Sequence, residues 1–140
     1  MVDLKGQYEH IKDQVNQSVL NTIESTKFIN GPQVKSFQAH LEQYLGVKHV
    51  IPCANGTDAL QIAMMGLGLK PGDEVITADF TFAATVEVIS LLGLTPVLVD
   101  VDPKTFNIDL AAIEKAIGPK TKAIIPVHLF GQAADMEEIL

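Results

Sequence analysis

From residue 47 onward, short apolar runs alternate with helical patterns, and this alternation restricts the fold more than any other feature of the sequence. Short apolar runs are typical of buried strands, and apolar residues three or four positions apart are typical of helices. Strands are predicted at 47–52, 74–78, 96–101 and 122–127, and helices at 59–67, 82–92, 110–117 and 135–140. Strands that alternate with helices form βαβ units, so the sequence predicts an α/β fold with a mostly parallel sheet between helices.

The first part of the chain has a purely helical pattern. Apolar residues recur at three- and four-residue steps over residues 4–23, which predicts an amphipathic helix. Pro32 is typical of the first turn of a second helix. We therefore predict a helical segment over residues 1–46 and an α/β segment over 47–140. Because the chain ends inside a predicted βα unit, we expect it to be a fragment of a longer protein.

The composition argues against several classes of function. The net charge is −7 and all 10 basic residues are lysine, a pattern that does not favour nucleic-acid binding. No apolar run approaches the ~18 residues that span a bilayer, and the N-terminus lacks a signal-peptide pattern. We therefore expect a cytoplasmic protein that binds neither nucleic acid nor membrane. Cys53, the only cysteine, excludes an intrachain disulfide and a cysteine-based metal site; no metal centre is predicted, and Cys53 is expected to be a buried structural thiol.

A glycine-containing loop follows the first predicted strand. In open α/β sheets, ligands bind at the carboxyl ends of the strands, where this loop should lie. Gly56 would let an anion approach the backbone closely, and Thr57 could cap the next helix and offer its hydroxyl, so a phosphate would fit. An ordinary loop with a threonine cap explains the same spacing, and the loop matches neither a dinucleotide-binding nor a Walker motif. The residues alone predict an α/β site for an anion and leave its ligand open.

Other polar and aromatic residues follow the later strands. Phe80 and Phe82 could offer a flat face to a ring, although core packing is the commoner role of a single phenylalanine. His128 could act as an acid, a base or a ring contact, or be satisfied by a neighbouring backbone group. Asp100 and Asp102 invite a metal or acid–base interpretation, but we predict structural roles for them, with Asp102 forming a turn ahead of Pro103.

A series of sequence blocks resembles one known family. The blocks are Phe28–Pro32, Ala54–Leu60, Pro71–Val75, Thr81–Thr85, Val99–Pro103, Lys120–His128 and Gly131–Asp135. In this order they resemble the DegT/DnrJ/EryC1/StrS sugar aminotransferases, of the fold-type I pyridoxal-phosphate (PLP) superfamily. The resemblance implies that residues 47–140 are the first part of the PLP-binding large domain and that residues 1–46 contribute a loop at the substrate mouth.

The resemblance also implies roles for individual residues. The backbone amides of Thr57 and Asp58, the Thr57 hydroxyl and the close approach at Gly56 would hold the phosphate of PLP. Phe82 would stack on its pyridine ring. Thr26 and Phe28 fall where relatives touch the nucleotide sugar. Relatives often have glycine and tyrosine at these two positions, so a hydrogen bond from a ring hydroxyl is not expected here.

By the same resemblance, no catalytic residue lies in this segment. None of the 10 lysines is in a matching motif and no Asp-x-Ala-Gln motif is present, so we expect the Schiff-base lysine and the aspartate that pairs with the pyridine nitrogen beyond residue 140. The chain alone should then be inactive.

The expected activity of the parent protein is transfer of an amino group to a nucleotide-linked keto sugar, for polysaccharide or glycan biosynthesis. Glutamate is the expected amino-acid donor, and the active site would be shared across a homodimer. Two alternatives remain open: a PLP-dependent nucleotide-sugar dehydratase, which is a lyase, and a non-catalytic regulatory module of the same fold.

Overall fold

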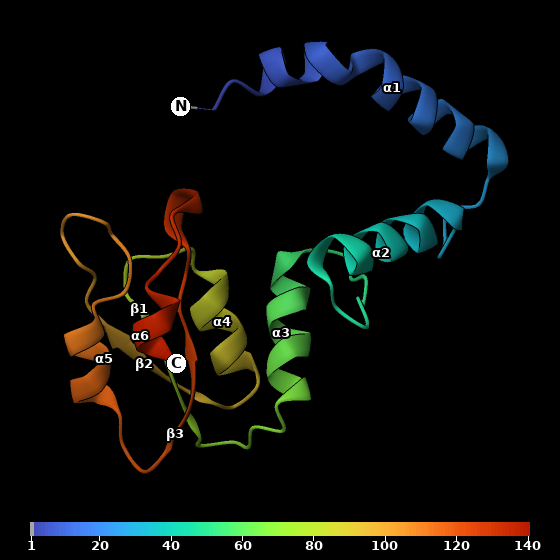
Figure 1. Ribbon diagram of the computed structural model, residues 1–140. Helices are drawn as coiled ribbons and strands as arrows, with labels where there is room; N and C mark the ends of the chain where they lie inside the picture. Colours follow the sequence, from blue (N-terminus) through green and yellow to red (C-terminus); the bar gives the residue numbers. More distant parts are fainter. Residues whose placement is uncertain (1) are drawn as a thin grey trace. The chain divides into compact units, whose positions relative to one another are not determined.

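The computed structural model describes residues 2–140 and divides the chain into two compact units, one up to Pro52 and one from Cys53 to Leu140 (Figure 1). The first unit contains the helices α1 (Leu4–Ser25) and α2 (Pro32–Leu45), as the sequence predicted. The division of functional domains after residue 46 stays a prediction. Within the described residues, every helix is too short or too polar to cross a membrane.

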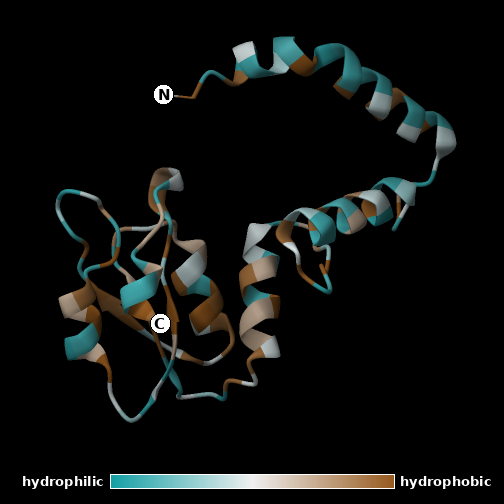
Figure 2. Ribbon diagram, in the orientation of Figure 1, coloured by the Kyte–Doolittle hydropathy of each residue, from teal (hydrophilic) through white to brown (hydrophobic). Residues whose placement is uncertain are grey.

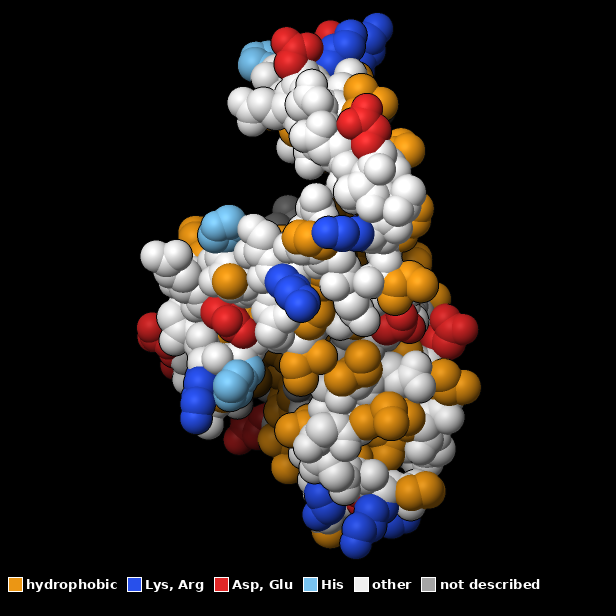
Figure 3. All heavy atoms as spheres, turned by 90° about the vertical axis from the view of Figure 1, so that its right-hand side faces the viewer, with side chains coloured by type: hydrophobic (Ala, Val, Ile, Leu, Met, Phe, Trp, Pro, Cys, Tyr) orange, Lys and Arg blue, Asp and Glu red, His pale blue; other side chains and the backbone are white. Residues whose placement is uncertain are grey.

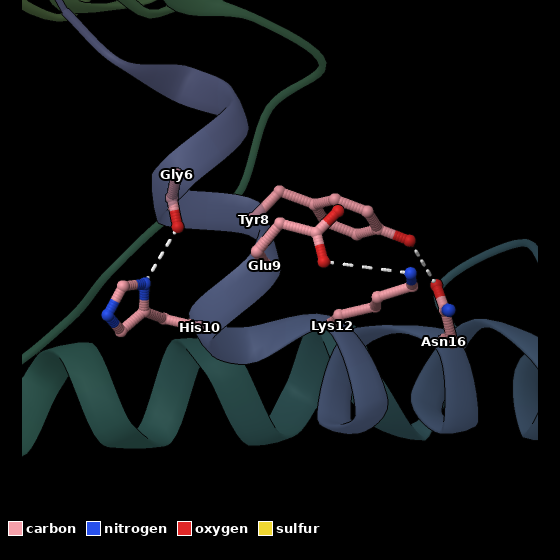
Figure 4. A network of polar contacts seen from close by, with 6 residues as sticks. All are labelled: Gly6, Tyr8, Glu9, His10, Lys12 and Asn16. Atoms are coloured by element: carbon pink, nitrogen blue, oxygen red, sulfur yellow. Dashed lines mark hydrogen bonds and ion pairs between the residues drawn. The ribbon is translucent and has the colours of Figure 1, made fainter.

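Helix α1 satisfies several polar side chains within its own turns (Figure 4). The Tyr8 hydroxyl donates to Asn16 Oδ1 at 2.9 Å, and Lys12 Nζ lies 3.7 Å from Glu9 Oε2. The side chains of this ion pair are 46% and 53% exposed, so it adds little stability. No described side chain of α1 is buried, and its apolar residues lie on the surface of the chain.

The second unit is built on a parallel sheet in the order β2-β1-β3. Its strands are β1 (Glu74–Ala78), β2 (Thr95–Val99) and β3 (Thr121–Ile125), and its helices are α3 (Gly56–Gly66), α4 (Ala84–Leu91), α5 (Leu110–Ala116) and α6 (Met136–Ile139), with a 3-10 turn at Leu129–Gly131. This confirms the predicted α/β fold with parallel strands.

Alternate residues of β1 face two hydrophobic clusters, which place the sheet between helices. Ile76 belongs to a cluster that includes Ile113 of α5. Val75 belongs to the other cluster, with Val88 of α4 and Met64 of α3. This alternation follows from the two-residue period of a strand. The strands and α4 carry some of the most hydrophobic colours of the second unit in Figure 2, and the central strand β1 is the one buried over nearly its whole length.

Residues 47–52 do not form the predicted strand. The backbone amide of Val50 donates to Glu42 Oε1 at 3.0 Å. An apolar extended run becomes a strand only where a neighbouring backbone accepts and donates hydrogen bonds, and no described strand pairs with this run. Cys53 is exposed, so the prediction of a buried thiol was wrong; it lies outside the sheet, and its sulfur is 3.4 Å from the carbonyl oxygen of Asn55.

Helix α3 is less buried than its sequence predicted. The run from Ala59 to Leu67 is apolar on nearly all sides, yet Met64 is its only fully buried side chain among the described residues. Ile62 is 44% exposed and Met65 61%. Figure 3, which views the molecule from the side of α3, shows hydrophobic side chains gathered on this surface. An all-round apolar helix needs covering elements on several sides, and among the described elements α3 packs mainly against α4.

Candidate functional site

The first turn of α3 is organised by Asn55. This residue has an extended backbone (φ −162°, ψ 175°), and its Oδ1 accepts a hydrogen bond from the amide of Asp58 at 2.9 Å. Its Nδ2 donates in return to Asp58 Oδ2 at 3.0 Å. A side-chain oxygen that accepts from an amide of the first turn is the usual way a helix N-terminus is capped. The cap is therefore Asn55, not Thr57.

The cap leaves other groups of this turn available. Within residues 2–140, the amides of Gly56 and Thr57 and the Thr57 hydroxyl form no hydrogen bond. A Cβ added to Gly56 would meet nothing within 4 Å, so an approach to the backbone is open there. Free amides at a helix N-terminus carry partial positive charge and hold phosphates well. These groups fit the phosphate of PLP.

The backbone amide of Asp58 is less available to a phosphate than the amides of Gly56 and Thr57. This amide, expected to hold the phosphate, already has an acceptor in Asn55. The N-terminal end of the helix dipole stabilises the Asp58 carboxylate. At close range, however, this carboxylate would repel a bound phosphate. A phosphate would therefore compete with Asn55 Oδ1 for this amide, whereas Gly56 and Thr57 offer theirs without competition.

Phe82 lies in the loop between β1 and α4 and is 78% exposed. Phe82 therefore does not pack in the hydrophobic core, which was the alternative interpretation of this side chain. Phe80, which lies two residues before Phe82, contacts Phe106 with the ring centroids 5.5 Å apart. Between them, Thr81 Oγ1 is buried with no hydrogen-bond partner among the described residues. Phe82 is the more exposed of the two rings, since Phe80 is 51% exposed, and its contact with a cofactor ring stays a prediction.

Thr26 and Phe28 belong to the first unit, where they line a groove of about 490 Å³. The groove is formed by Thr26, Lys27, Phe28, Ile29, Asn30, Gly31, Pro32 and Lys35. Phe28 is 61% exposed. Sequence reasoning did not select the two lysines. The signal that could have found them is the absence of any acidic residue over 25–41, in a chain whose net charge is −7.

The carboxylates and the histidine after the later strands have structural partners. Asp102 Oδ1 accepts from the amides of Lys104 at 2.8 Å and Thr105 at 2.9 Å, and these hydrogen bonds lower the pKa of Asp102. The predicted turn is confirmed. His128 Nδ1 accepts from the amide of Ala134 at 3.0 Å, which favours the backbone-satisfied interpretation. No cluster of metal-binding side chains occurs over the described 2–140.

The comparisons with known proteins agree with the sequence blocks. The model of the DegT/DnrJ/EryC1/StrS aminotransferase family matches residues 9–140. A UDP-2-acetamido-2-deoxy-3-oxo-D-glucuronate aminotransferase of Pseudomonas aeruginosa is 50% identical over 138 residues, which cover 99% of this chain and 38% of the relative. A pleiotropic regulatory protein of Geobacillus stearothermophilus is 51% identical over 139 residues, covering 99% of this chain and 37% of that protein. The chain thus spans less than two fifths of the length of these relatives.

A solved structure supports both fold and cofactor. The crystal structure of NtdA from Bacillus subtilis is 41% identical in sequence and matches with a TM-score of 0.85. The matched region covers 94% of this chain and 30% of the NtdA chain. It contains the cofactor PMP, the amine form of PLP. The expected cofactor is thereby confirmed for the family. From residue 9 to its last residue, the chain belongs to the DegT/DnrJ/EryC1/StrS aminotransferase family.

Proposed function

We propose that this chain is the cofactor-phosphate and substrate-entry part of a PLP-dependent enzyme that transfers an amino group to a nucleotide-linked keto sugar. The observation that carries the proposal is the first turn of α3, where Gly56 and Thr57 offer unengaged amides beside the Thr57 hydroxyl. The Pseudomonas relative is named as an aminotransferase of a UDP-linked 3-oxo sugar, which supports the choice of substrate class.

Each residue of the proposed site has a separate task. Gly56, Thr57 and Asp58 bind the phosphate, with the Asp58 amide shared between the phosphate and Asn55. Phe82 covers one face of the cofactor ring and excludes water from it. Thr26 and Phe28 contact the nucleotide sugar. PLP supplies the electron sink that labilises bonds at the amine-bearing carbon.

The proposal extends to groups that this chain does not contain. The lysine that carries PLP and the aspartate that pairs with its ring nitrogen are placed beyond residue 140, since none of the 10 lysines here lies in a matching motif. Glutamate is the proposed donor, and a cytoplasmic homodimer with a shared active site is the proposed assembly.

The test uses the whole reading frame that encodes this chain. Purified protein is incubated with PLP, glutamate and a UDP-linked 3-keto sugar, and 2-oxoglutarate and the aminated sugar are measured. We expect turnover, and expect Thr57→Val to weaken PLP binding about tenfold, because a hydrogen bond to a charged group contributes roughly 1.5–3 kcal/mol. Thr95→Val, at an exposed position of β2, is the matched control and should bind PLP as the unmodified protein does.

Two results would contradict the proposal. Reduction of the PLP-loaded protein with borohydride should fix the cofactor to a single lysine; a modified lysine within residues 1–140 would show that the residue assignment is wrong. Binding of PLP without release of 2-oxoglutarate would instead favour a dehydratase if the keto sugar lost water. Without either reaction, the regulatory module would be favoured.

A further inference from the structure

The carboxylate of Asp58 is the one acidic group in the first turn of α3. It belongs to the residue that directly follows Gly56 and Thr57, whose amides have no partner within residues 2–140. In that part of the chain, no lysine or histidine forms an ion pair with the Asp58 carboxylate. A carboxylate readily accepts hydrogen bonds from nearby backbone amides, and it repels a second anion. Asp58 is therefore a competitor of any phosphate that binds at this turn.

The side chain of Asn55 restrains this carboxylate. Asn55 Nδ2 donates to Asp58 Oδ2 at 3.0 Å, and Asn55 Oδ1 accepts from the Asp58 amide at 2.9 Å. Among the described residues, Asn55 Nδ2 is the only group that donates a hydrogen bond to the Asp58 carboxylate. Because side chains occupy discrete rotamers, a carboxylate that is held beside Asn55 does not occupy a rotamer that reaches the amides of Gly56 and Thr57. The availability of these two amides thus depends on the contact between Asn55 and Asp58.

Asparagine supplies both of the groups that this contact uses. Its side-chain oxygen accepts from the amide of Asp58 and its side-chain nitrogen donates to the carboxylate, whereas an aspartate at the same position would have acceptors only. Serine caps a helix about as well as asparagine, but its single hydroxyl oxygen cannot take the places of both Asn55 Oδ1 and Asn55 Nδ2. A serine would therefore satisfy the cap, and the hold on the carboxylate is what asparagine adds.

We propose that Asn55 is a positioning residue for the cofactor phosphate, because it holds the Asp58 carboxylate away from the amides of Gly56 and Thr57. This inference rests on the proposed function, which puts the phosphate of PLP at this turn. It adds to that site a residue that acts through Asp58 and takes no part in the chemistry of amino transfer. Without Asn55 Nδ2, the carboxylate is free to compete for the amides, so the phosphate binds more weakly although the helix stays capped.

The inference can be tested by a double-mutant cycle in the whole protein that the complete reading frame encodes. The unmodified protein, Asn55→Ser, Asp58→Asn and the double variant are prepared without PLP and titrated with it, and the absorbance of bound cofactor gives each dissociation constant. We expect Asn55→Ser to weaken PLP binding about fivefold, which corresponds to one hydrogen bond in a partly exposed site. Asp58→Asn should bind PLP at least as tightly as the unmodified protein. In the Asp58→Asn background, Asn55→Ser should change nothing further.

Two controls separate the positioning of the phosphate from a general effect on the structure. Pyridoxal has the ring and the aldehyde of PLP but no phosphate, so Asn55→Ser should bind pyridoxal as the unmodified protein does. Asp109→Ser is the matched variant, because Asp109 caps α5 in the same unit by accepting from the Ala112 amide at 2.7 Å. This variant changes a helix cap outside the phosphate loop and should leave the affinity for PLP unchanged.

Three results would overturn the inference. A loss of PLP affinity in Asn55→Ser that persists in the Asp58→Asn background would show that Asn55 acts as a cap only. An equal loss of affinity for pyridoxal would show that the effect is structural and does not concern the phosphate. Full affinity for PLP in Asn55→Ser would show that the Asp58 carboxylate does not compete.

These outcomes are separable from those of the proposed function. The proposed function is tested by turnover and by Thr57→Val, whereas the inference is tested by the coupling between Asn55 and Asp58. Turnover together with weaker PLP binding in Thr57→Val, but without that coupling, would retain the function and remove the inference. The coupling in a protein that binds PLP and transfers no amino group would retain the inference and remove the proposed function.

Discussion

Asn55 and Asp58 bind each other reciprocally at the start of α3: Asn55 Oδ1 accepts from the Asp58 amide at 2.9 Å, and Asn55 Nδ2 donates to Asp58 Oδ2 at 3.0 Å. The pair satisfies one amide of the first turn and leaves those of Gly56 and Thr57 without a partner among the described residues. The cap and the proposed phosphate contacts therefore use different groups of one short loop.

Asn55→Ala should destabilise the chain by about 1 kcal/mol, because it removes the oxygen that caps the helix. The free energy of unfolding in urea measures this loss. Asn55→Ser keeps a capping oxygen and should lose only a few tenths of a kcal/mol. Equal losses in the two variants would show that the contact from Asn55 Nδ2 to Asp58, and not the cap, stabilises the turn.

Thr26→Gly should raise the free energy of unfolding by about 1 kcal/mol. Thr26 ends α1 in a left-handed conformation, with φ 55° and ψ 13°, which is unfavourable for a β-branched residue and free of strain for glycine. Thermal unfolding followed by the helical circular-dichroism signal would measure the change. Thr22→Gly, inside α1, is the control and should lower stability by about 0.5 kcal/mol. A loss in both variants would argue against strain at Thr26.

Two threonines with buried hydroxyls should respond differently to replacement by valine. Thr77 is fully buried and its Oγ1 donates to the carbonyl oxygen of Ile125 at 3.0 Å, which joins β1 to β3. Thr77→Val should therefore cost about 1 kcal/mol. Thr81 Oγ1 is buried without a partner among residues 2–140, so Thr81→Val should not lower the free energy of unfolding in urea. A loss in Thr81→Val equal to that in Thr77→Val would reveal a hydrogen bond at Thr81.

The contribution of Asp102 to stability should depend on pH. Hydrogen bonds from the amides of Thr105 and Lys104 hold its pKa below the ordinary value of 3.8. A carboxyl whose pKa is lower in the folded state stabilises that state above its unfolded pKa, and the gain disappears as the pH falls through the folded pKa. Asp102→Asn should thus be less stable than the unmodified chain at neutral pH.

Urea unfolding of both chains over a pH series measures this effect. The difference between them should shrink as the pH falls below 3.8. Asp79→Asn, another exposed carboxylate of the second unit, serves as a control for the general effect of removing one negative charge. A difference that stays constant down to strongly acidic pH would mean that hydrogen bonding to the Asp102 carboxylate is not its cause.

Much of the secondary structure could be predicted from sequence because its signals are local. The apolar run at 74–78 matches β1, and Pro32 begins α2 as expected. Residue type and short spacing are enough for such elements, since propensity, capping and helix periodicity act over a few residues. The family blocks indicate Gly56, Thr57 and Phe82 as cofactor contacts, and these assignments stay predictions.

Burial and pairing needed the tertiary structure, because both depend on segments distant in the sequence. The run at 47–52 resembles a strand in sequence but pairs with no strand in the part of the chain that the structure describes, and Cys53, next to it, is exposed. Which amides of the α3 turn are free depends on the rotamer of Asn55, and the availability of Lys27 and Lys35 depends on what surrounds them. The sequence by itself determined the order of helices and strands and the family; tertiary structure decided which polar groups already have partners and which remain open to a ligand.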